Sequence, residues 1–303
     1  MFAPRLFIFF VLLASIFHSP FPIPTSYAFS LTDDNGHVLE ISAPPRRIIS
    51  LAPGITEILF DLGLGERVVG ITDYCNYPPE ALAKPRVGGL QPNLEKIISL
   101  KPDLILGSTG LYQAQNTVQF TRFNIPYFLV DAPTLENIFG AILRIGTISG
   151  IEMKALEKVR ILRQRRDIVR RAAAEAAHPR VLYVVDREPL ISVGQGSYIN
   201  ELVADAGGIN IASDLQKAYP VISMEYVIQR DPQVIILAMD ADQDLTPAQK
   251  EYWGRWPILS AVRDGRIYKV QRDRINRPGP RVIDGLEELA GLLHPNRPGG
   301  GAP

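Results

Sequence analysis

PNLEKIISLKPDLIL (residues 92–106) and ISMEYVIQRDPQVII (residues 222–236) align without a gap, although they lie in opposite halves of the chain. In each stretch, an apolar run with helical spacing ends at a proline, and a short apolar run typical of a buried strand follows. Glu95 aligns with Glu225, and Pro102 aligns with Pro232. The sequence therefore predicts the same helix, turn and strand in both halves, which indicates an internal repeat.

The repeat extends upstream of both stretches, where TEILFDLGLG (residues 56–65) aligns with NELVADAGGI (residues 200–209). The matched acidic residues are Glu57 with Glu201 and Asp61 with Asp205. Between the two matched segments, the first half holds about 14 more residues than the second, and we expect this extra length in or near residues 73–91. The chain is therefore built from two units of one plan.

Short β-branched runs alternate with helical runs in both units, and this alternation is typical of a parallel sheet covered by helices. The predicted strands include residues 46–51, 67–71, 125–131, 180–186 and 265–270. Residues 134–178 show no strand signal and instead predict two helices. The second of these is strongly basic and spans about 25 residues, or about 37 Å, which is long enough to connect two lobes.

The sequence thus predicts an α/β fold with two lobes, each a mostly parallel sheet flanked by helices, joined by a long interdomain helix. The expected divisions are a signal peptide (1–28), an N-terminal lobe (29–151), a linking helix (152–178), a C-terminal lobe (179–294) and a disordered tail (295–303).

The first 28 residues have the organisation of a cleavable signal peptide. Arg5 precedes an apolar run, and the small residues Ser26 and Ala28 stand at the two positions that a signal peptidase reads, with cleavage expected after Ala28. An uncleaved anchor is the alternative, but the apolar run is shorter than the ~20 residues that span a bilayer. Cys75 is the only cysteine, so no cysteine at the cleavage site can accept a lipid. We expect a free periplasmic monomer without stable membrane insertion.

The composition excludes several classes of function. The 32 basic and 32 acidic residues cancel, which removes the electrostatic case for nucleic acid. No nucleophile elbow or phosphate-binding loop is present, so we expect no catalytic residues and no enzyme. The four histidines do not cluster, and Cys75 has no partner thiol, so we expect no metal site and interpret Cys75 as a small packing side chain.

Five segments of the chain resemble the helix-linked class of periplasmic binding proteins, the cobalamin, haem and ferric-siderophore receptors of ABC importers. These segments are residues 47–81, 87–106, 199–211, 222–236 and 256–270. DYCNYPPEA (residues 73–81) and NLEKI (residues 93–97) are most similar to the cobalamin receptors. The resemblance implies two rigid lobes that hold a ligand between them and deliver it to a permease dimer.

The resemblance also implies roles for individual residues. Tyr74 matches a position that stacks on a corrinoid ring, and Tyr219 matches an aromatic residue of the other lobe. Asp273 and Arg277 match residues that contact the amide rim or nucleotide loop of the ligand. Tyr112 and Arg187 are further candidates because they lie on predicted strand-end loops. Two positions where cobalamin receptors can use tryptophan are here occupied by Gly89 and Ser108, which departs from the family pattern.

Glu95 and Glu225 match glutamates that dock into arginine pockets of the permease. The alternative is that each carboxylate only complements the dipole of the helix it begins, an effect of ~0.3–1 kcal/mol. Cobalamin is the leading ligand. Ferric siderophores, for which Arg187, Arg277 and Arg281 could converge, and haem are the alternatives within transport. A ligand-sensing receptor is the alternative of another class.

Overall fold

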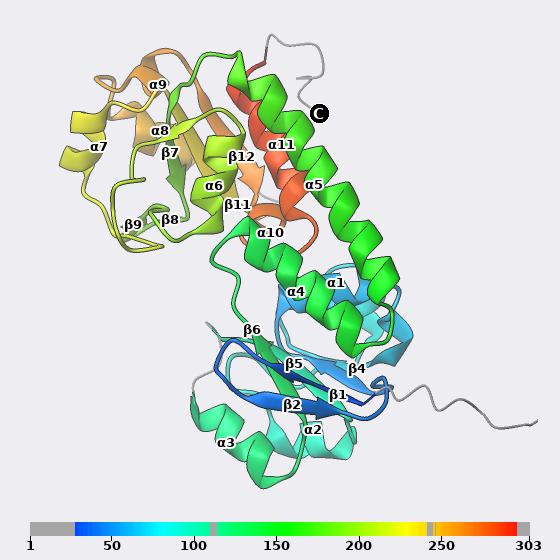
Figure 1. Cartoon of the computed structure of the whole chain (residues 1–303). Coiled ribbons are helices and arrows are strands. Elements are labelled where there is room, and N and C mark those ends of the chain that lie inside the picture. Colours follow the sequence, from blue (N-terminus) through cyan, green and yellow to red (C-terminus); the bar gives the residue numbers. More distant parts are fainter. Residues whose placement is uncertain (1–27, 110–113, 241–244, 246, 296–303) are drawn as a thin grey trace, which may run out of the picture.

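The computed structural model describes residues 28–109, 114–240, 245 and 247–295 (Figure 1). The predicted signal peptide lies outside the described residues apart from Ala28, and the predicted tail lies outside them apart from Pro295. Tyr112 also lies outside them.

The N-terminal lobe is built on a four-stranded parallel sheet in the order β4-β3-β5-β6. These strands are β3 (Ile48–Ser50), β4 (Val68–Ile71), β5 (Leu104–Ser108) and β6 (Tyr127–Val130). Its other elements are β1 (Phe29–Thr32), β2 (Val38–Ile41), α1 (Pro53–Asp61), η1 (Gly65–Arg67), η2 (Pro79–Ala83), α2 (Leu94–Ser99) and α3 (Ala114–Arg122). The antiparallel hairpin β1–β2 was not predicted from the sequence.

The C-terminal lobe repeats this plan with a parallel sheet in the order β10-β7-β11-β12. These strands are β7 (Arg180–Val184), β10 (Ile209–Asn210), β11 (Val234–Met239) and β12 (Ile267–Gln271). The other elements are β8 (Asp186–Arg187), β9 (Leu190–Ile191), α6 (Tyr198–Asp205), α7 (Met224–Arg230), α8 (Pro247–Gly254), α9 (Ser260–Arg263), α10 (Arg272–Ile275) and α11 (Val282–Leu293). Both four-stranded sheets have the same strand order. Numbered along the chain within each sheet, the order across the sheet is second, first, third and fourth. The predicted two-lobed α/β fold is confirmed.

The backbone shows the duplication more closely than the sequence does. Lys101 and Asp231 stand at matched positions before a proline, and both have the left-handed conformation, with φ of 47° and 42°. Few residues other than glycine adopt this conformation. The helices that these residues follow, α2 and α7, begin at matched caps, where the side chains of Asn93 and Ser223 accept backbone N–H bonds. The duplication therefore extends to backbone conformation and helix capping.

A helical hairpin connects the lobes. Helix α4 (Leu135–Ile148) packs along α5 (Glu152–Ala174), which runs from the lower lobe to the upper lobe in Figure 1. Gly146 allows the close approach of the two helices, because a Cβ there would overlap the Ala155 side chain. Helix α5 ends at Ala174, so the remaining residues of the predicted 152–178 segment form the turn into β7.

The repeated aspartates hold α5 to both lobes. Asp61 of α1 binds Lys158 at 2.7 Å, and its counterpart Asp205 of α6 binds Arg166 at 2.6 Å. Arg165 adds ion pairs to α11. The basic composition of α5, seen in the sequence without an explanation, thus serves attachment to the lobes.

One hydrophobic cluster runs through both lobes. It joins Ile55 of α1, Ile142 of α4 and Val159 of α5 to Tyr183 of β7 and Leu286 of α11. Each lobe also has a smaller outer cluster on the other face of its sheet. Because the main core is shared, the two lobes are not independent folding units.

Candidate functional site

The predicted ligand residues lie at the carboxyl ends of strands, where ligands bind in open α/β sheets. Tyr74 follows β4, Arg187 lies in β8 just after β7, and Asp273 and Arg277 follow β12. Tyr219 lies in the C-terminal lobe between β10 and α7. The elements that carry these residues belong to both lobes, as a binding site between the lobes requires.

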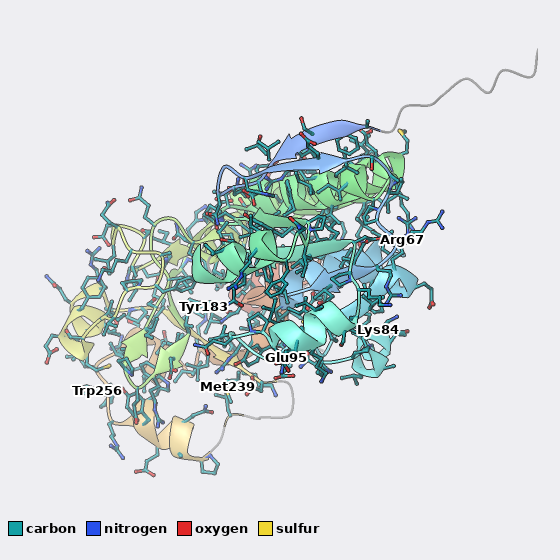
Figure 2. All side chains as sticks on the ribbon, turned by 90° about the horizontal axis from the view of Figure 1, so that it is seen from below. Arg67, Lys84, Glu95, Tyr183, Met239 and Trp256 are labelled. Atoms are coloured by element: carbon teal, nitrogen blue, oxygen red, sulfur yellow. The ribbon has the colours of Figure 1, made fainter. Side chains whose placement is uncertain are left out.

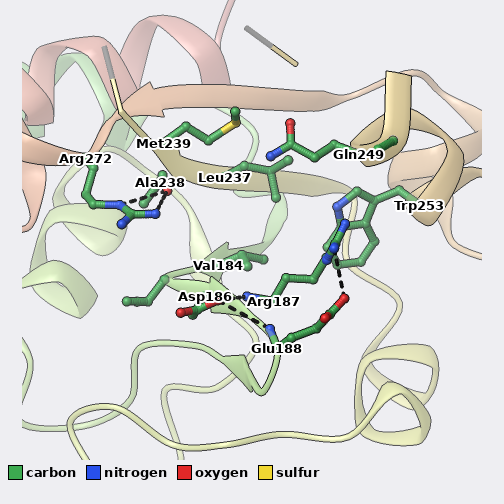
Figure 3. A pocket seen from close by; sticks show the side chains of 12 residues that line it. Val184, Asp186, Arg187, Glu188, Leu237, Ala238, Met239, Gln249, Trp253 and Arg272 are labelled. Carbon is green, nitrogen blue, oxygen red and sulfur yellow. Dashed lines mark hydrogen bonds and ion pairs between the residues drawn. The ribbon is translucent and has the colours of Figure 1, made fainter. Parts of the chain in front are cut away.

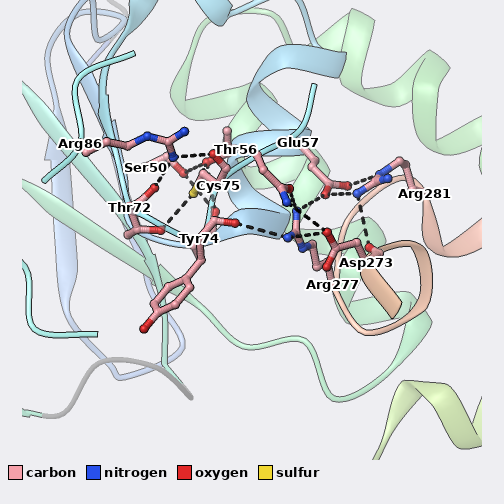
Figure 4. A network of polar contacts seen from close by, with 12 residues as sticks. Ser50, Thr56, Glu57, Thr72, Tyr74, Cys75, Arg86, Asp273, Arg277 and Arg281 are labelled. Atoms are coloured by element: carbon pink, nitrogen blue, oxygen red, sulfur yellow. Dashed lines mark hydrogen bonds and ion pairs between the residues drawn. The ribbon is translucent and has the colours of Figure 1, made fainter. Parts of the chain in front are cut away.

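Tyr74 is half exposed, and side chains on the inner side of its loop hold the loop in place (Figure 4). The fully buried thiol of Cys75 lies 3.1 Å from both Thr56 Oγ1 and Thr72 Oγ1. Arg86 donates to the carbonyl oxygens of Thr72 and Cys75 at 2.7 and 2.6 Å. The loop presents the tyrosine ring from a fixed base, and Cys75 is part of that base rather than a group exposed at the surface.

Gly89 lies against the Tyr74 ring. A Cβ at position 89 would lie 3.2 Å from Tyr74 Oη and 3.4 Å from the nearest ring carbon, which is tighter than ordinary contact. Tyr74 therefore fills the space next to position 89, and a side chain there would require the Tyr74 ring to move.

Asp273 and Arg277 contact residues of the N-terminal lobe. Arg277 binds Asp273 at 2.7 Å, donates to Asn76 Oδ1 at 2.6 Å and donates to the Tyr74 carbonyl at 3.3 Å. Asn76 Nδ2 in turn lies 3.4 Å from Asp273 Oδ2. The structure thus brings Tyr74, Asp273 and Arg277 together, with Asn76 as a partner that was not predicted.

Glu57 of α1 also belongs to this network. Its carboxylate receives two hydrogen bonds from Arg281, at 2.8 Å from Nε and 2.5 Å from Nη2, and lies 3.5 Å from Arg277. The guanidinium of Arg281 also stacks on the Tyr77 ring, 3.8 Å from its centroid. Burial raises the pKa of the Glu57 carboxyl above its usual value, although both arginines act to lower it.

We call the set Glu57, Asn76, Asp273, Arg277 and Arg281 the interlobe joint. Its two carboxylates and two guanidinium groups balance in charge, which is the condition under which buried ions are tolerated. Gly54 contributes to the same place, because a Cβ there would overlap the Pro278 carbonyl. The backbones of the two lobes therefore touch at the joint.

The C-terminal half of the joint is fixed to its own lobe by two buried tyrosines. Tyr183 donates to Asn276 Oδ1 and Tyr198 donates to the Ile275 carbonyl, each at 2.7 Å. Burial raises the pKa of both phenols far above the usual value, so they stay protonated donors. The segment that carries Asp273 and Arg277 is thus held by these tyrosines of its own lobe and by Asn76 and Glu57 of the other lobe.

Arg187 lies apart from the joint, in a cavity of about 410 Å³ in the C-terminal lobe (Figure 3). Arg187 pairs with Glu188 at 2.9 Å and lies over the Tyr252 ring, 4.8 Å from its centroid. The apolar lining of the cavity is Val184, Val185, Leu237, Ala238, Met239, Ala248 and Trp253, and its polar lining is Asp186, Arg187, Glu188, Gln249 and Arg272. Tyr219, from the same lobe, is half exposed.

Glu95 and Glu225 are both exposed at the starts of α2 and α7. Figure 2 shows Glu95 on the face of the molecule turned towards the viewer. Among the described residues, neither carboxylate forms an ion pair. A hydrogen bond from the Ser223 side chain lowers the pKa of Glu225, so this group is ionised at neutral pH. Both glutamates are free to meet a cationic partner.

The three histidines of the described chain make structural contacts. His37 stacks on Tyr127, and His178 and His294 lie 2.9 Å from the carbonyls of Gly207 and Ala206 at the end of α6. In the part of the chain that the structure describes, no three His, Cys, Asp or Glu side chains are grouped to hold a metal ion. Within the same ranges, no helix combines the length and apolar character of a membrane span.

A family model described as periplasmic binding protein matches residues 48–273, which hold both four-stranded sheets, the linking helix and three residues of the joint, Glu57, Asn76 and Asp273. The chain belongs to the periplasmic binding protein family. The vitamin B12-binding protein of Vibrio cholerae is 32% identical to this chain over 252 residues, which cover 82% of this chain and 90% of that protein. A substrate-binding lipoprotein of an uncharacterized ABC transporter in Bacillus subtilis is 30% identical over 277 residues, with 89% and 87% covered.

Solved structures of this family have the same fold. The periplasmic vitamin B12-binding protein of Vibrio cholerae superposes with a TM-score of 0.73, covering 82% of this chain and 97% of that one at 32% identity. A periplasmic haem-binding protein from Roseiflexus, 25% identical, gives the same TM-score with 82% and 98% covered. These proteins bind different ligands, so the fold alone does not select one.

Sequence reasoning missed Glu57, Asn76 and Arg272 as contributors to the site region. The Glu57–Arg281 pair joins residues 224 positions apart, and no local motif reports such a contact. The alignment of Glu57 with Glu201 marked a position shared by both repeats, but it carried no information on the partner.

Proposed function

We propose that this chain is the periplasmic receptor of an ABC importer, which captures cobalamin between its lobes, delivers it to the permease and catalyses nothing. The observation that supports this most directly is the rigid presentation of the half-exposed Tyr74 ring beside the interlobe joint. A fixed aromatic face suits a wide, flat macrocycle. The identity to a protein named for vitamin B12 binding points to the same ligand.

In this proposal, Tyr74 and Tyr219 contact the faces of the corrinoid, and Asp273 and Asn76 meet polar groups at its edge. Arg277 contributes its remaining donor capacity while it stays bound to Asp273. Arg187 lines the C-terminal cavity, with an apolar floor that includes Trp253 and Met239. An apolar surface with a few polar groups is the usual composition of a small-molecule site.

A ferric siderophore fits the charges less well. The proposed arginines would have to converge on an anionic ligand, but each is already paired, Arg187 with Glu188, Arg277 with Asp273 and Arg281 with Glu57. A ligand would need to displace these carboxylates, and the buried Glu57 would then be left unpaired. Haem requires an axial ligand, for which Tyr74 offers a phenol, and it is therefore the second candidate.

Calorimetric titration of the purified protein with cyanocobalamin, haemin and a ferric hydroxamate tests the ligand. We expect submicromolar binding of cyanocobalamin that weakens by about 1–3 kcal/mol on Tyr74→Ala or Tyr219→Ala, the range for loss of one aromatic stacking contact. Phe123→Ala, which removes a half-exposed ring just after α3, is the matched control. No cyanocobalamin binding beside tight binding of haemin or the hydroxamate would overturn the cobalamin assignment.

The proposal includes export with removal of residues 1–28. Intact-mass analysis of a periplasmic extract measures this directly, and we expect a mature chain that begins near Phe29. A mass that corresponds to the full chain from Met1 would contradict it.

A further inference from the structure

Besides the shared hydrophobic cluster, two separate sets of polar contacts attach the lobes to each other. Helix α5 is bound to both lobes by the ion pairs of Asp61 and Asp205, and these contacts lie along the helix. The interlobe joint connects α1 directly to the segment between α10 and α11 without involving α5. Because these two attachments lie at separate places, each one opposes rotation of the lobes about the other.

The joint depends on Glu57 more than on any other member. Its side chain is only 2% exposed, and it receives both Arg281 hydrogen bonds as well as the approach of Arg277. A guanidinium and a carboxylate that share two parallel hydrogen bonds are fixed in distance and in angle. Without the Glu57 charge, the two guanidinium groups would face each other with Asp273 as their one carboxylate partner in the joint.

The joint also touches the proposed site. Arg277, which approaches Glu57 on one side, binds Asp273 and the carbonyl of Tyr74 on the other. Residues of both lobes that face the proposed ligand are therefore connected, through Arg277, to the buried carboxylate of Glu57.

We propose that Glu57 is a positioning residue, which fixes the spacing of the two lobes through Arg281 and Arg277 without touching the ligand. The consequence for affinity depends on the function proposed above, whereas the consequence for lobe spacing does not. Loss of the Glu57 charge removes the fork with Arg281, and we expect the separation of the lobes to vary more widely although α5 and the shared hydrophobic cluster still connect them.

Spin labels on the two lobes measure this separation by pulsed electron paramagnetic resonance in the ligand-free protein. Val118→Cys on α3 and Ile258→Cys before α9 provide label sites that are 64% and 61% exposed, whereas native Cys75 is 0% exposed and escapes labelling. We expect Glu57→Gln to broaden the distance distribution relative to the labelled parent. Glu157→Gln is the matched control, because Glu157 forms the same two-bond fork with Arg160 on the surface of a single helix.

A second variant guards against misfolding. Glu57→Met combined with Arg281→Met removes both charges of the fork, so no unpaired ion is buried and the chain should still fold. We expect the double variant to show the broad distribution as well, and affinity for the ligand found by titration to fall about tenfold, as for other residues that couple to a site without contacting it.

A narrow parental distribution in both variants would refute the proposal, whether or not cobalamin proves to be the ligand. Equal broadening in Glu157→Gln would refute it too. Weaker ligand binding with an unchanged distance distribution would make Glu57 part of the ligand site and would likewise overturn the positioning role.

Discussion

Arg47 and Arg180 make the same pair of hydrogen bonds in the two lobes. Arg47 immediately precedes β3, Arg180 is the first residue of β7, and each donates from Nε to two consecutive carbonyl oxygens where a matched helix ends. The acceptors are residues 100–101, just after α2, at 3.1 and 3.0 Å, and residues 230–231, the last residue of α7 and the one after it, at 3.0 and 2.9 Å. Cations are favourable at a helix carboxyl end, where the carbonyls have no partner within the helix. The two helices that carry Glu95 and Glu225 in their first turns are therefore held by the same arrangement of hydrogen bonds.

The first prediction concerns these two arginines. Arg47→Met should speed amide hydrogen exchange in α2 and leave α7 unchanged, and Arg180→Met should do the reverse. The expected loss is about 1 kcal/mol of local stability, or about fivefold in exchange rate, for hydrogen bonds of this kind. Each variant serves as the control for the other. Equal effects on both helices would show that the arginines act on global stability instead.

The second prediction separates docking from ligand capture. Glu95→Ala with Glu225→Ala should abolish uptake in cells while the calorimetric affinity of the purified protein stays unchanged, because both carboxylates are exposed and without an ion pair in the described chain. Glu152→Ala changes an exposed glutamate at the start of α5 and should leave uptake intact. A ligand affinity reduced along with uptake would contradict the docking role. Intact uptake would favour a sensing receptor.

The third prediction tests how closely the backbones meet at the joint. Gly54→Ala places a methyl group against the Pro278 carbonyl and should destabilise the protein by about 1–3 kcal/mol in chemical unfolding, as overpacking does. Gly140→Ala is the matched control, because position 140 also lies in a helix and a Cβ there meets nothing within 4 Å. The control should gain up to about 1 kcal/mol from helix propensity. Similar stabilities for the two variants would contradict the close contact.

The fourth prediction concerns pH. Hydrogen bonds from the Ser260 N–H and hydroxyl, with the nearby charge of Arg180, lower the pKa of Asp231 in the folded chain. A lowered pKa stabilises the fold above the pKa of the unfolded chain, about 3.9, and this contribution is lost as pH falls through the folded value. Asp231→Asn should therefore lower Tm at pH 7, with a deficit that shrinks towards pH 3. A deficit independent of pH would show that the charge of Asp231 is not involved.

The α/β plan, the duplication and the linking helix were predictable because each leaves a local or repeated pattern. The periodicity of α5 and the prolines after α2 and α7 are properties of neighbouring residues, and folding preserves them. The hairpin β1–β2 escaped prediction, because two four-residue strands carry little periodicity. The surface positions of Glu95 and Glu225 followed from the repeat.

The joint could not be predicted in this way. Its residues come from α1, the loop after β4 and the segment after β12, and only packing of the two lobes brings them together. Arg277 was expected at the ligand and is found bound to Asp273 and Asn76. A family motif identifies the residue, but which of its neighbours share the guanidinium depends on the three-dimensional fold.

The shared hydrophobic cluster has a consequence for how the chain matures. Residues of α1 and of the last helix, α11, belong to one core, so the first half of the polypeptide lacks part of its packing surface until the last residues have been synthesised. A nascent or truncated chain that ends before Val282 would expose Ile55, Ile142 and their apolar neighbours to water. We expect such a chain to stay unfolded until the last helix is available to complete the core.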